Sequence, residues 1–235
     1  MVGETLHALL DLVLPASCVG CGLDGTAWCE ACSAPLRARP RRAVPDPCPA
    51  GLPSTWAVAR YDGAVRDAVV AHKEHGARVL ARPLAGALAA SAAAACPGAD
   101  PVLLVPAPSR AAAVRARGDD PTARLARAAA ALLRGDGRPA RVLPVLRLGR
   151  RALDQAGLSS RQRAANLAGA VRVVRLGGGP PAYRVVLVDD VVTTGATLVE
   201  CARALAGAGF DVAGAAVVAA TARRPPGVPS GQPRG

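Results

Sequence analysis

The chain has 235 residues and a formal net charge of +12 at neutral pH; 51% of its residues are hydrophobic, but only 2% are aromatic. This balance excludes a disordered polyelectrolyte, and it predicts one globular α/β domain with a core of Ala, Val and Leu, plus a small appendage. Arg carries almost all of the positive charge, because Lys73 is the only lysine. Such a charge favours polyanionic partners, either phosphorylated metabolites or nucleic acid.

The first residues predict an amphipathic helix packed on the body of the protein. Its apolar positions have helical spacing: Leu6, Leu9, Leu10, Val13 and Leu14. Glu4, His7 and Asp11 interrupt the apolar run and no basic residue precedes it, so we do not expect a signal peptide. No stretch reaches membrane-spanning length without charges. We therefore expect a cytoplasmic protein that does not span a membrane.

Two Cys-x-x-Cys pairs follow, Cys18–Cys21 and Cys29–Cys32. Each pair can hold a metal ion from a tight turn, and two pairs complete the tetrahedral thiolate shell that suits structural Zn²⁺. Disulfides are the alternative, but they are rare in a protein without a secretion signal. Cys48 is a fifth candidate, which could replace one of the four ligands or be idle.

The next segments predict a linker, a strand and a helix in turn. Residues 37–53 are rich in Pro and Arg, which is typical of a linker over the surface, and residues 56–61 resemble a strand. The helix that follows ends near Gly76 and carries Lys73 close to its end. That single lysine indicates either a site that needs a compact ammonium group or a chance surface position. We interpret the flanking His72 and His75 as solvated.

Alternating helices and strands occupy the middle of the chain. We expect helices over residues 79–95 and 121–134, and strands over residues 102–105 and 141–146. Pro106-Ala-Pro-Ser-Arg110 follows the first of these strands, where backbone N–H groups, Ser109 and Arg110 can face an anion. Residues 154–167 form a polar, basic run that resembles a mobile loop leading into a helix.

The most informative stretch is Arg-Val-Val-Leu-Val-Asp-Asp-Val-Val-Thr-Thr-Gly-Ala-Thr-Leu, residues 184–198. Residues 185–188 predict a strand buried on both faces of a parallel sheet, with Asp189 and Asp190 where it ends. Residues 193–197 predict a hydroxyl-rich turn before a helix, and the N–H groups of a helix N-terminus bind phosphate. Carboxylates suit the hydroxyls of an attached sugar, so the stretch predicts a site for a ribose 5-phosphate.

This stretch resembles the 5-phosphoribosyl-1-pyrophosphate (PRPP) motif of type I phosphoribosyltransferases. The resemblance implies that Asp189 and Asp190 hold the ribose hydroxyls and that Ser109 and Arg110 hold the pyrophosphate, with Mg²⁺ bridging pyrophosphate oxygens and ribose hydroxyls. It also implies catalytic roles for Asp189, Asp190 and Arg110. The ligand-binding set implied for PRPP further includes Lys73, Val188, Thr193, Thr194, Gly195, Ala196 and Thr197.

Almost the whole chain is similar to the ComF family of bacterial competence-associated proteins, which join a zinc-binding segment to a phosphoribosyltransferase fold. The shared features occur in order: the amphipathic leader, the Cys pairs, the helix around Lys73, Pro-x-Pro-Ser-Arg, Gln-x-Gly-Leu-Ser-x-x-x-Arg-x-x-Asn-Leu and the PRPP motif. Two features depart from the family pattern. Asp119-Asp120-Pro121 stands where many members have Phe-Asn-Gln, and Cys48 lacks a paired cysteine.

These patterns predict a type I phosphoribosyltransferase-like fold, with a parallel sheet flanked by helices and the ligand at the carboxyl ends of the strands. We expect an N-terminal segment over residues 1–50, the main domain over residues 55–222 and a disordered tail over residues 223–235. The function expected from the motif is PRPP binding with transfer or recognition of a phosphoribosyl group. The alternative is a non-enzymatic DNA-uptake factor that binds single-stranded DNA and other uptake proteins.

Overall fold

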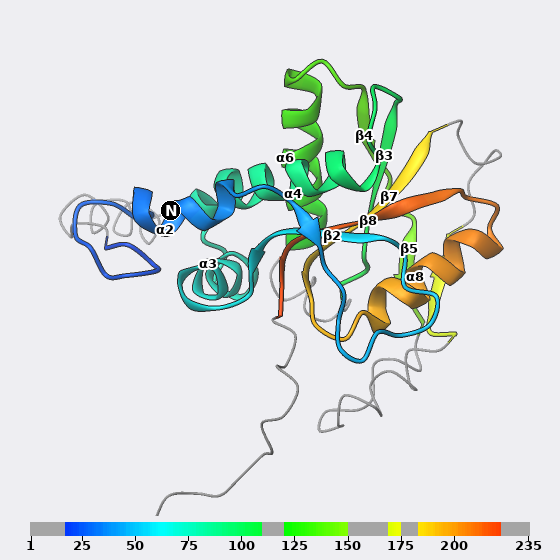
Figure 1. The fold of residues 1–235 in the computed structure, drawn as a ribbon, viewed down its shortest axis with the longest axis horizontal. Helices are drawn as coiled ribbons and strands as arrows, with labels where there is room; N and C mark the ends of the chain where they lie inside the picture. The colour runs from blue at the N-terminus through cyan, green and yellow to red at the C-terminus, as the bar shows by residue number, and fades with distance from the viewer. Residues whose placement is uncertain (1–16, 110–119, 150–168, 175–182, 222–235) are drawn as a thin grey trace, which may run out of the picture.

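The computed structural model describes residues 17–109, 120–149, 169–174 and 183–221, which build a six-stranded sheet with helices on both faces (Figure 1). The strand order is β1-β2-β8-β7-β3-β4, and every pairing is parallel except that of the edge strand β1. A separate antiparallel pair joins β5 to β6. The strands are β1 Arg41–Arg42, β2 Thr55–Arg60, β3 Val102–Pro106, β4 Ala140–Val142, β5 Leu146–Leu148, β6 Val171–Val173, β7 Arg184–Val192 and β8 Val212–Ala220.

Helices cover the two faces of the sheet unequally. One face packs against α3 (Gly63–Glu74), α4 (Ala81–Ala95) and α6 (Pro121–Gly135), and the other packs against α8 (Ala196–Gly207) and the β5–β6 pair. The other helical segments of the described residues are short: α2 Glu30–Ser33, η1 Ala34–Arg37 and η2 Arg78–Leu80. The structure therefore confirms the expected mostly parallel α/β fold. The helix expected in the first 14 residues and the tail expected over residues 223–235 lie outside the described residues.

The apolar run of β7 explains why this strand lies at the centre. Successive side chains of a strand point to opposite faces, so Val186 and Val188 join the core under α3, α4 and α6, while Val185 and Leu187 join the core under α8. All four are at most 1% exposed. A strand with apolar residues at every position needs cover on both faces, and a helix-flanked parallel sheet provides it.

Three sequence-based expectations are wrong in detail. The strand expected over residues 141–146 is two short strands, β4 and β5, because Pro144 interrupts it and cannot donate to a strand neighbour. Strand β7 continues past the two acids to Val192, because β8 runs beside it to that point. His72 is not solvated: it is 3% exposed on the inner side of α3, and its Nε2 lies 3.4 Å from a guanidinium nitrogen of Arg124.

The cysteine-containing segment lies at one end of the body, where it contacts the start of α3. Ala64, in the first turn of α3, packs against the cluster formed by Cys18, Cys29 and Cys32. Among the described residues, no helix combines the length and the apolar character that a membrane crossing requires.

Candidate functional site

The carboxyl end of β3 lies beside β7 at Val188, directly before two of the residues expected to form the site. The two strands are parallel neighbours, and the Ala107 N–H donates to the Val188 carbonyl at 2.8 Å, just beyond the end of β3. Asp189 and Asp190 are the next two residues of β7, beyond the point where β3 ends. The Val188 side chain is fully buried, so only its backbone is available at this edge.

Asp189 and Asp190 leave the strand toward different layers. The pleat that sends Val186 and Val188 toward the α3 side sends Asp190 the same way, and its Oδ2 lies 2.5 Å from Lys73 Nζ at the end of α3. Asp189 instead shares the face of Leu187, on the α8 side. The Asp190 N–H donates to Asp189 Oδ1 at 2.9 Å, and the Val191 N–H donates to Asp190 Oδ1 at 2.8 Å. Both carboxylates are therefore held in place before any ligand arrives.

Charge at this strand end is only partly compensated. Burial first, and then the neighbouring Asp190 carboxylate, raise the pKa of Asp189 to about 8, although Lys73 acts in the opposite direction. Partial burial works to lower the pKa of Lys73, but the Asp190 carboxylate outweighs it, and the pKa ends above its ordinary value. The site thus holds a fixed ammonium and two close carboxyl groups that favour an additional proton or cation.

The turn after β7 has the form expected of a phosphate-binding turn. Residues 193–195 connect the strand to α8, Gly195 adopts a left-handed conformation with φ 77°, and Thr193 and Thr194 are exposed. The Ala196 N–H reaches the Thr194 hydroxyl at 3.4 Å. Ala196 and Thr197 are half-buried in the first turn of α8, where backbone N–H groups lack the carbonyl partners that later turns have.

The linker before β2 packs on this turn, which the sequence did not predict. A Cβ added to Gly195 would lie 2.8 Å from Leu52 Cδ1 and 3.2 Å from Pro49 Cγ, and one added to Gly51 would lie 3.7 Å from Val199. The linker thus forms one wall of the turn. Only its apolar and proline content hinted at this, and no periodic pattern fixes the partner of such a segment.

The loop after β3 places Ser109 beside the start of α6. The Ser109 hydroxyl donates to Asp120 Oδ1 at 2.9 Å, and the same oxygen accepts the N–H groups of Thr122 and Ala123 at 3.0 and 3.2 Å. Asp120 is therefore the N-cap of α6, with Pro121 in the first turn, as Asp-Pro at a helix start favours. Arg110 lies outside the described residues, as do residues 154–167.

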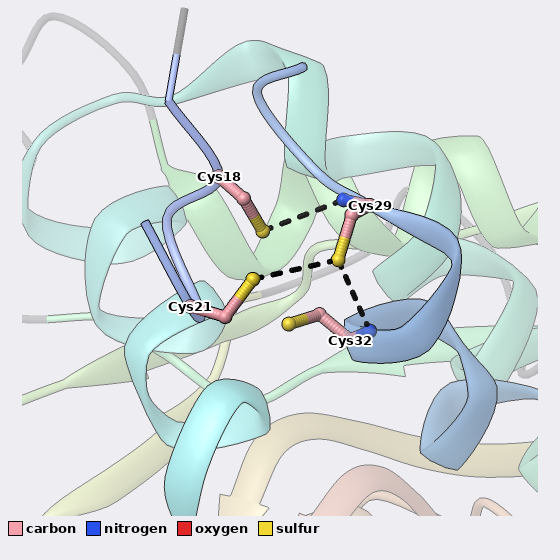
Figure 2. A group of neighbouring side chains, drawn as sticks. All are labelled: Cys18, Cys21, Cys29 and Cys32. Carbon is pink, nitrogen blue, oxygen red and sulfur yellow. Dashed lines mark hydrogen bonds between the residues drawn. The ribbon is translucent and has the colours of Figure 1, made fainter. Parts of the chain in front are cut away.

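The four N-terminal cysteines form a second candidate site (Figure 2). The Sγ atoms of Cys18, Cys21, Cys29 and Cys32 all lie within 4.8 Å of one another. Backbone N–H groups point at two of the sulfurs: the Cys29 N–H reaches Cys18 Sγ at 3.4 Å, and the Cys32 N–H reaches Cys29 Sγ at 3.5 Å. This set of four soft donors, brought together by two tight turns, can hold a metal ion.

Thiol chemistry in the cluster suits a metal rather than disulfides. The Sγ atoms of Cys21 and Cys29 are 3.6 Å apart, well beyond the length of a disulfide bond, and all four thiols are free. Burial works to raise the pKa of Cys18, but backbone N–H donors, led by Cys29, lower it to about 6, whereas burial raises the pKa of Cys32. Cys48 is exposed and lies outside the four-cysteine group, in the linker that packs on Gly195.

Comparison with known protein families finds a match, which covers about a third of the chain. Residues 153–228 match the model of the family described as "Phosphoribosyl transferase domain". The match contains β7, the turn at residues 193–195, α8 and β8. No curated protein matches the chain.

Proposed function

We propose that the chain binds PRPP together with Mg²⁺ at the carboxyl ends of β3 and β7, and that it transfers or recognises the phosphoribosyl group. One observation carries the proposal. Two carboxylates held in the last part of β7 stand three residues before a hydroxyl-rich turn at a helix N-terminus, within the segment that matches the phosphoribosyl transferase family model.

Each part of PRPP has a chemically suitable partner in this arrangement. The Asp189 and Asp190 carboxylates accept hydrogen bonds from the ribose 2′- and 3′-hydroxyls. The hydroxyls of Thr193 and Thr194 and the N–H groups of residues 195–197 donate hydrogen bonds to the 5′-phosphate. Lys73 supplies a compact cation beside Asp190, where a pyrophosphate oxygen can approach. We assign further pyrophosphate contacts to Ser109 and Arg110 on the same edge of the sheet.

The carboxyl pair also fits a divalent cation. Carboxylate oxygens are the ligands that Mg²⁺ prefers. Burial first, and then the close Asp190 carboxylate, raise the pKa of Asp189, and a cation at this position would neutralise the pair. When bound, Mg²⁺ would be held by the Asp189 and Asp190 carboxylates and would supply positive charge that neutralises the pyrophosphate. In a transfer reaction the two carboxylates would stabilise the positive charge that develops on the ribose, and Lys73 and Arg110 would stabilise the departing pyrophosphate.

We propose that the four cysteines bind one structural Zn²⁺, which gives the chain the two-part organisation of the ComF family. The set of four cysteine sulfurs supports zinc over harder ions. By this proposal the zinc segment is a fixed appendage of the phosphoribosyltransferase-like domain rather than part of the PRPP site. A role in DNA uptake follows only from the family resemblance.

A thermal-shift screen tests the proposed ligand. Wild-type protein is heated with PRPP, ribose 5-phosphate, inorganic pyrophosphate or single-stranded DNA, each with and without Mg²⁺. We expect PRPP to raise the melting temperature more with Mg²⁺ than without, and more than ribose 5-phosphate or pyrophosphate does alone. Equal shifts for all the phosphate compounds would indicate nonspecific anion binding and would reject the proposal.

Single-stranded DNA is the second candidate ligand, on a different surface. Arg37, Arg39, Arg41 and Arg42 are exposed and follow the cysteine cluster, and the Arg42 guanidinium lies 5.8 Å from the ring centre of Trp56. The Asp189 and Asp190 carboxylates would repel a DNA strand at the proposed PRPP site, so we propose separate sites. Replacing the four arginines with Ala should reduce the log–log salt dependence of DNA binding by about 0.7 for each phosphate that the variant no longer neutralises. Mutual displacement of DNA and PRPP in a fluorescence polarisation titration would contradict separate sites.

A further inference from the structure

The cysteine cluster and the proposed PRPP site are joined by a single helix, α3. Gly20 lies inside the first Cys-x-x-Cys turn, and a Cβ added there would be 2.6 Å from Ala64 Cβ and 2.8 Å from Cys32 Sγ. Ala64 belongs to the first turn of α3. The metal-binding turn therefore rests directly on the start of this helix, without room for one more methyl group.

The far end of α3 carries Lys73, whose ammonium lies 2.5 Å from Asp190. Ala64 and Lys73 are nine residues apart, which is about 13–14 Å along a helix at 1.5 Å per residue. An α-helix transmits a shift of its first turn to its last with little loss. A displacement of Ala64 would thus alter the approach of Lys73 to Asp190.

Other contacts limit how far α3 can move. Val65, Ala68, Val69 and Ala71 are buried and pack into the core that α4 and α6 share, so the cysteine segment can shift the helix only slightly. The cysteine turns have no such core, because Cys18, Cys29 and Cys32 form a small cluster with only Trp28 and Ala64 beside them among the described residues. Turns of this kind depend on a metal ion for their fixed shape.

We infer that metal bound at the four cysteines positions Lys73 through the Gly20–Ala64 contact and α3, so that metal occupancy raises the affinity of the PRPP site. This inference rests on the proposed function, and it assigns Gly20 and Ala64 as positioning residues. The coupling is reciprocal: PRPP also tightens metal binding. Because the core holds α3 independently, we expect an effect of about fivefold, at the lower end of measured couplings.

Calorimetry on the full chain tests the coupling. PRPP with Mg²⁺ is titrated into zinc-loaded protein, into protein stripped by a chelator that is then removed, and into stripped protein reloaded with zinc. We expect the stripped protein to bind about fivefold more weakly and the reloaded protein to recover. In Lys73→Met, stripping should change the affinity little, because the residue that carries the effect is gone.

Substitutions at the Gly20–Ala64 contact distinguish a change in the position of Lys73 from a loss of folded structure. Gly20→Ala pushes on Ala64 and also approaches Cys32 Sγ, so zinc content is measured beside PRPP affinity. We expect weaker PRPP binding in the zinc-loaded variant, and Ala64→Gly added to it should restore part of the affinity. Gly22→Ala is the matched control, because a Cβ there meets nothing within 4 Å although its φ of 76° is strained. If Gly20→Ala loses zinc, the coupling is tested by the PRPP affinities of the stripped and reloaded wild-type proteins alone.

Calorimetry distinguishes a failure of the metal coupling from a failure of PRPP binding. Equal PRPP affinity of zinc-loaded and stripped protein, with both folded by circular dichroism, would overturn the coupling and leave PRPP binding intact. Absence of binding by the zinc-loaded protein would overturn the proposed function itself. An equal decrease of affinity in Gly20→Ala and Gly22→Ala would also contradict the coupling.

Discussion

Asp189 and Asp190 are chain neighbours that face different layers of the protein. Asp190 has an ammonium partner in Lys73, whereas Asp189 is half-buried on the α8 side, where it adds to the effect of burial in raising the pKa of Cys201. The two carboxyl groups therefore have unequal surroundings although they are neighbours in the chain. Poorly compensated carboxylates of this kind are typical of binding sites, where ligand recognition opposes stability.

The raised pKa of Asp189 predicts a pH-dependent stability. Folded Asp189 keeps its proton up to about pH 8, but in the unfolded chain it releases the proton near the ordinary value of 3.8. Its contribution to stability is therefore lost progressively as pH rises through this window. Asp189→Asn should stabilise the protein relative to wild type, more at about pH 9 than at about pH 5, in urea denaturation without added Mg²⁺. A stability gain that shrinks as pH rises would contradict this account.

Asp190→Asn should weaken PRPP binding with Mg²⁺. The substitution removes a charge-assisted contact to a ribose hydroxyl, worth roughly 1.5–3 kcal/mol, which corresponds to about 10- to 150-fold in affinity. Calorimetry measures the change, with Asp211→Asn as the control. Asp211 is an exposed carboxylate that pairs with Arg184 at 3.3 Å, at the opposite end of β7. Equal decreases in both variants would indicate a general charge effect rather than a ribose contact.

At the scale of elements, the turn between β7 and α8 is fixed by its own backbone and by the linker. Gly195→Ala should destabilise the protein by about 1–2 kcal/mol, because the left-handed conformation is unfavourable for Ala and the new methyl group meets Leu52. Gly137→Ala is the matched control, since it has φ 82° but nothing within 4 Å of its Cβ. Denaturant unfolding should show the larger destabilisation for Gly195→Ala, and adding Leu52→Ala should recover part of it. Equal destabilisation by the two glycine substitutions would exclude a steric role for the linker.

The cysteine segment should depend on its metal ion. Protein purified without chelator should contain about one zinc per chain, and Cys18→Ser should lose the metal and loosen the segment, because ligation and folding are coupled. Elemental analysis and limited proteolysis measure the two effects. Cys48→Ser is the control and should keep its zinc. Loss of zinc in Cys48→Ser but not in Cys32→Ser would show that the ligand set is wrong.

Elements with a clear local sequence pattern could be predicted from the sequence. The segments that they contact in the folded protein could not. The apolar run of residues 185–188 predicts a buried strand and the Cys-x-x-Cys spacing predicts a four-cysteine cluster, and both are confirmed. The contacts of Lys73 with Asp190 and of Leu52 with Gly195 join residues more than a hundred positions apart. Such contacts depend on the order of the strands in the sheet, and the local hydrophobic pattern of a segment does not determine that order.

At the scale of the whole molecule, the parallel sheet brings distant segments to one edge. The end of β3, the end of β7, the start of α8 and the last turn of α3 converge there, although they span residues 73–197. Open α/β sheets bind ligands at this edge because strand ends and helix N-termini meet there. The linker and the cysteine segment add contacts from the N-terminal side, the first to the turn after β7 and the second to the start of α3.

The most direct test of PRPP binding is a calorimetric titration of PRPP into the zinc-loaded wild-type protein, with and without Mg²⁺. The account predicts one site per chain, tighter binding with Mg²⁺, and a marked decrease of affinity in the double variant Asp189→Asn, Asp190→Asn, which should remain folded. No heat with millimolar PRPP and Mg²⁺, or the same affinity in the wild type and the double variant, would contradict it.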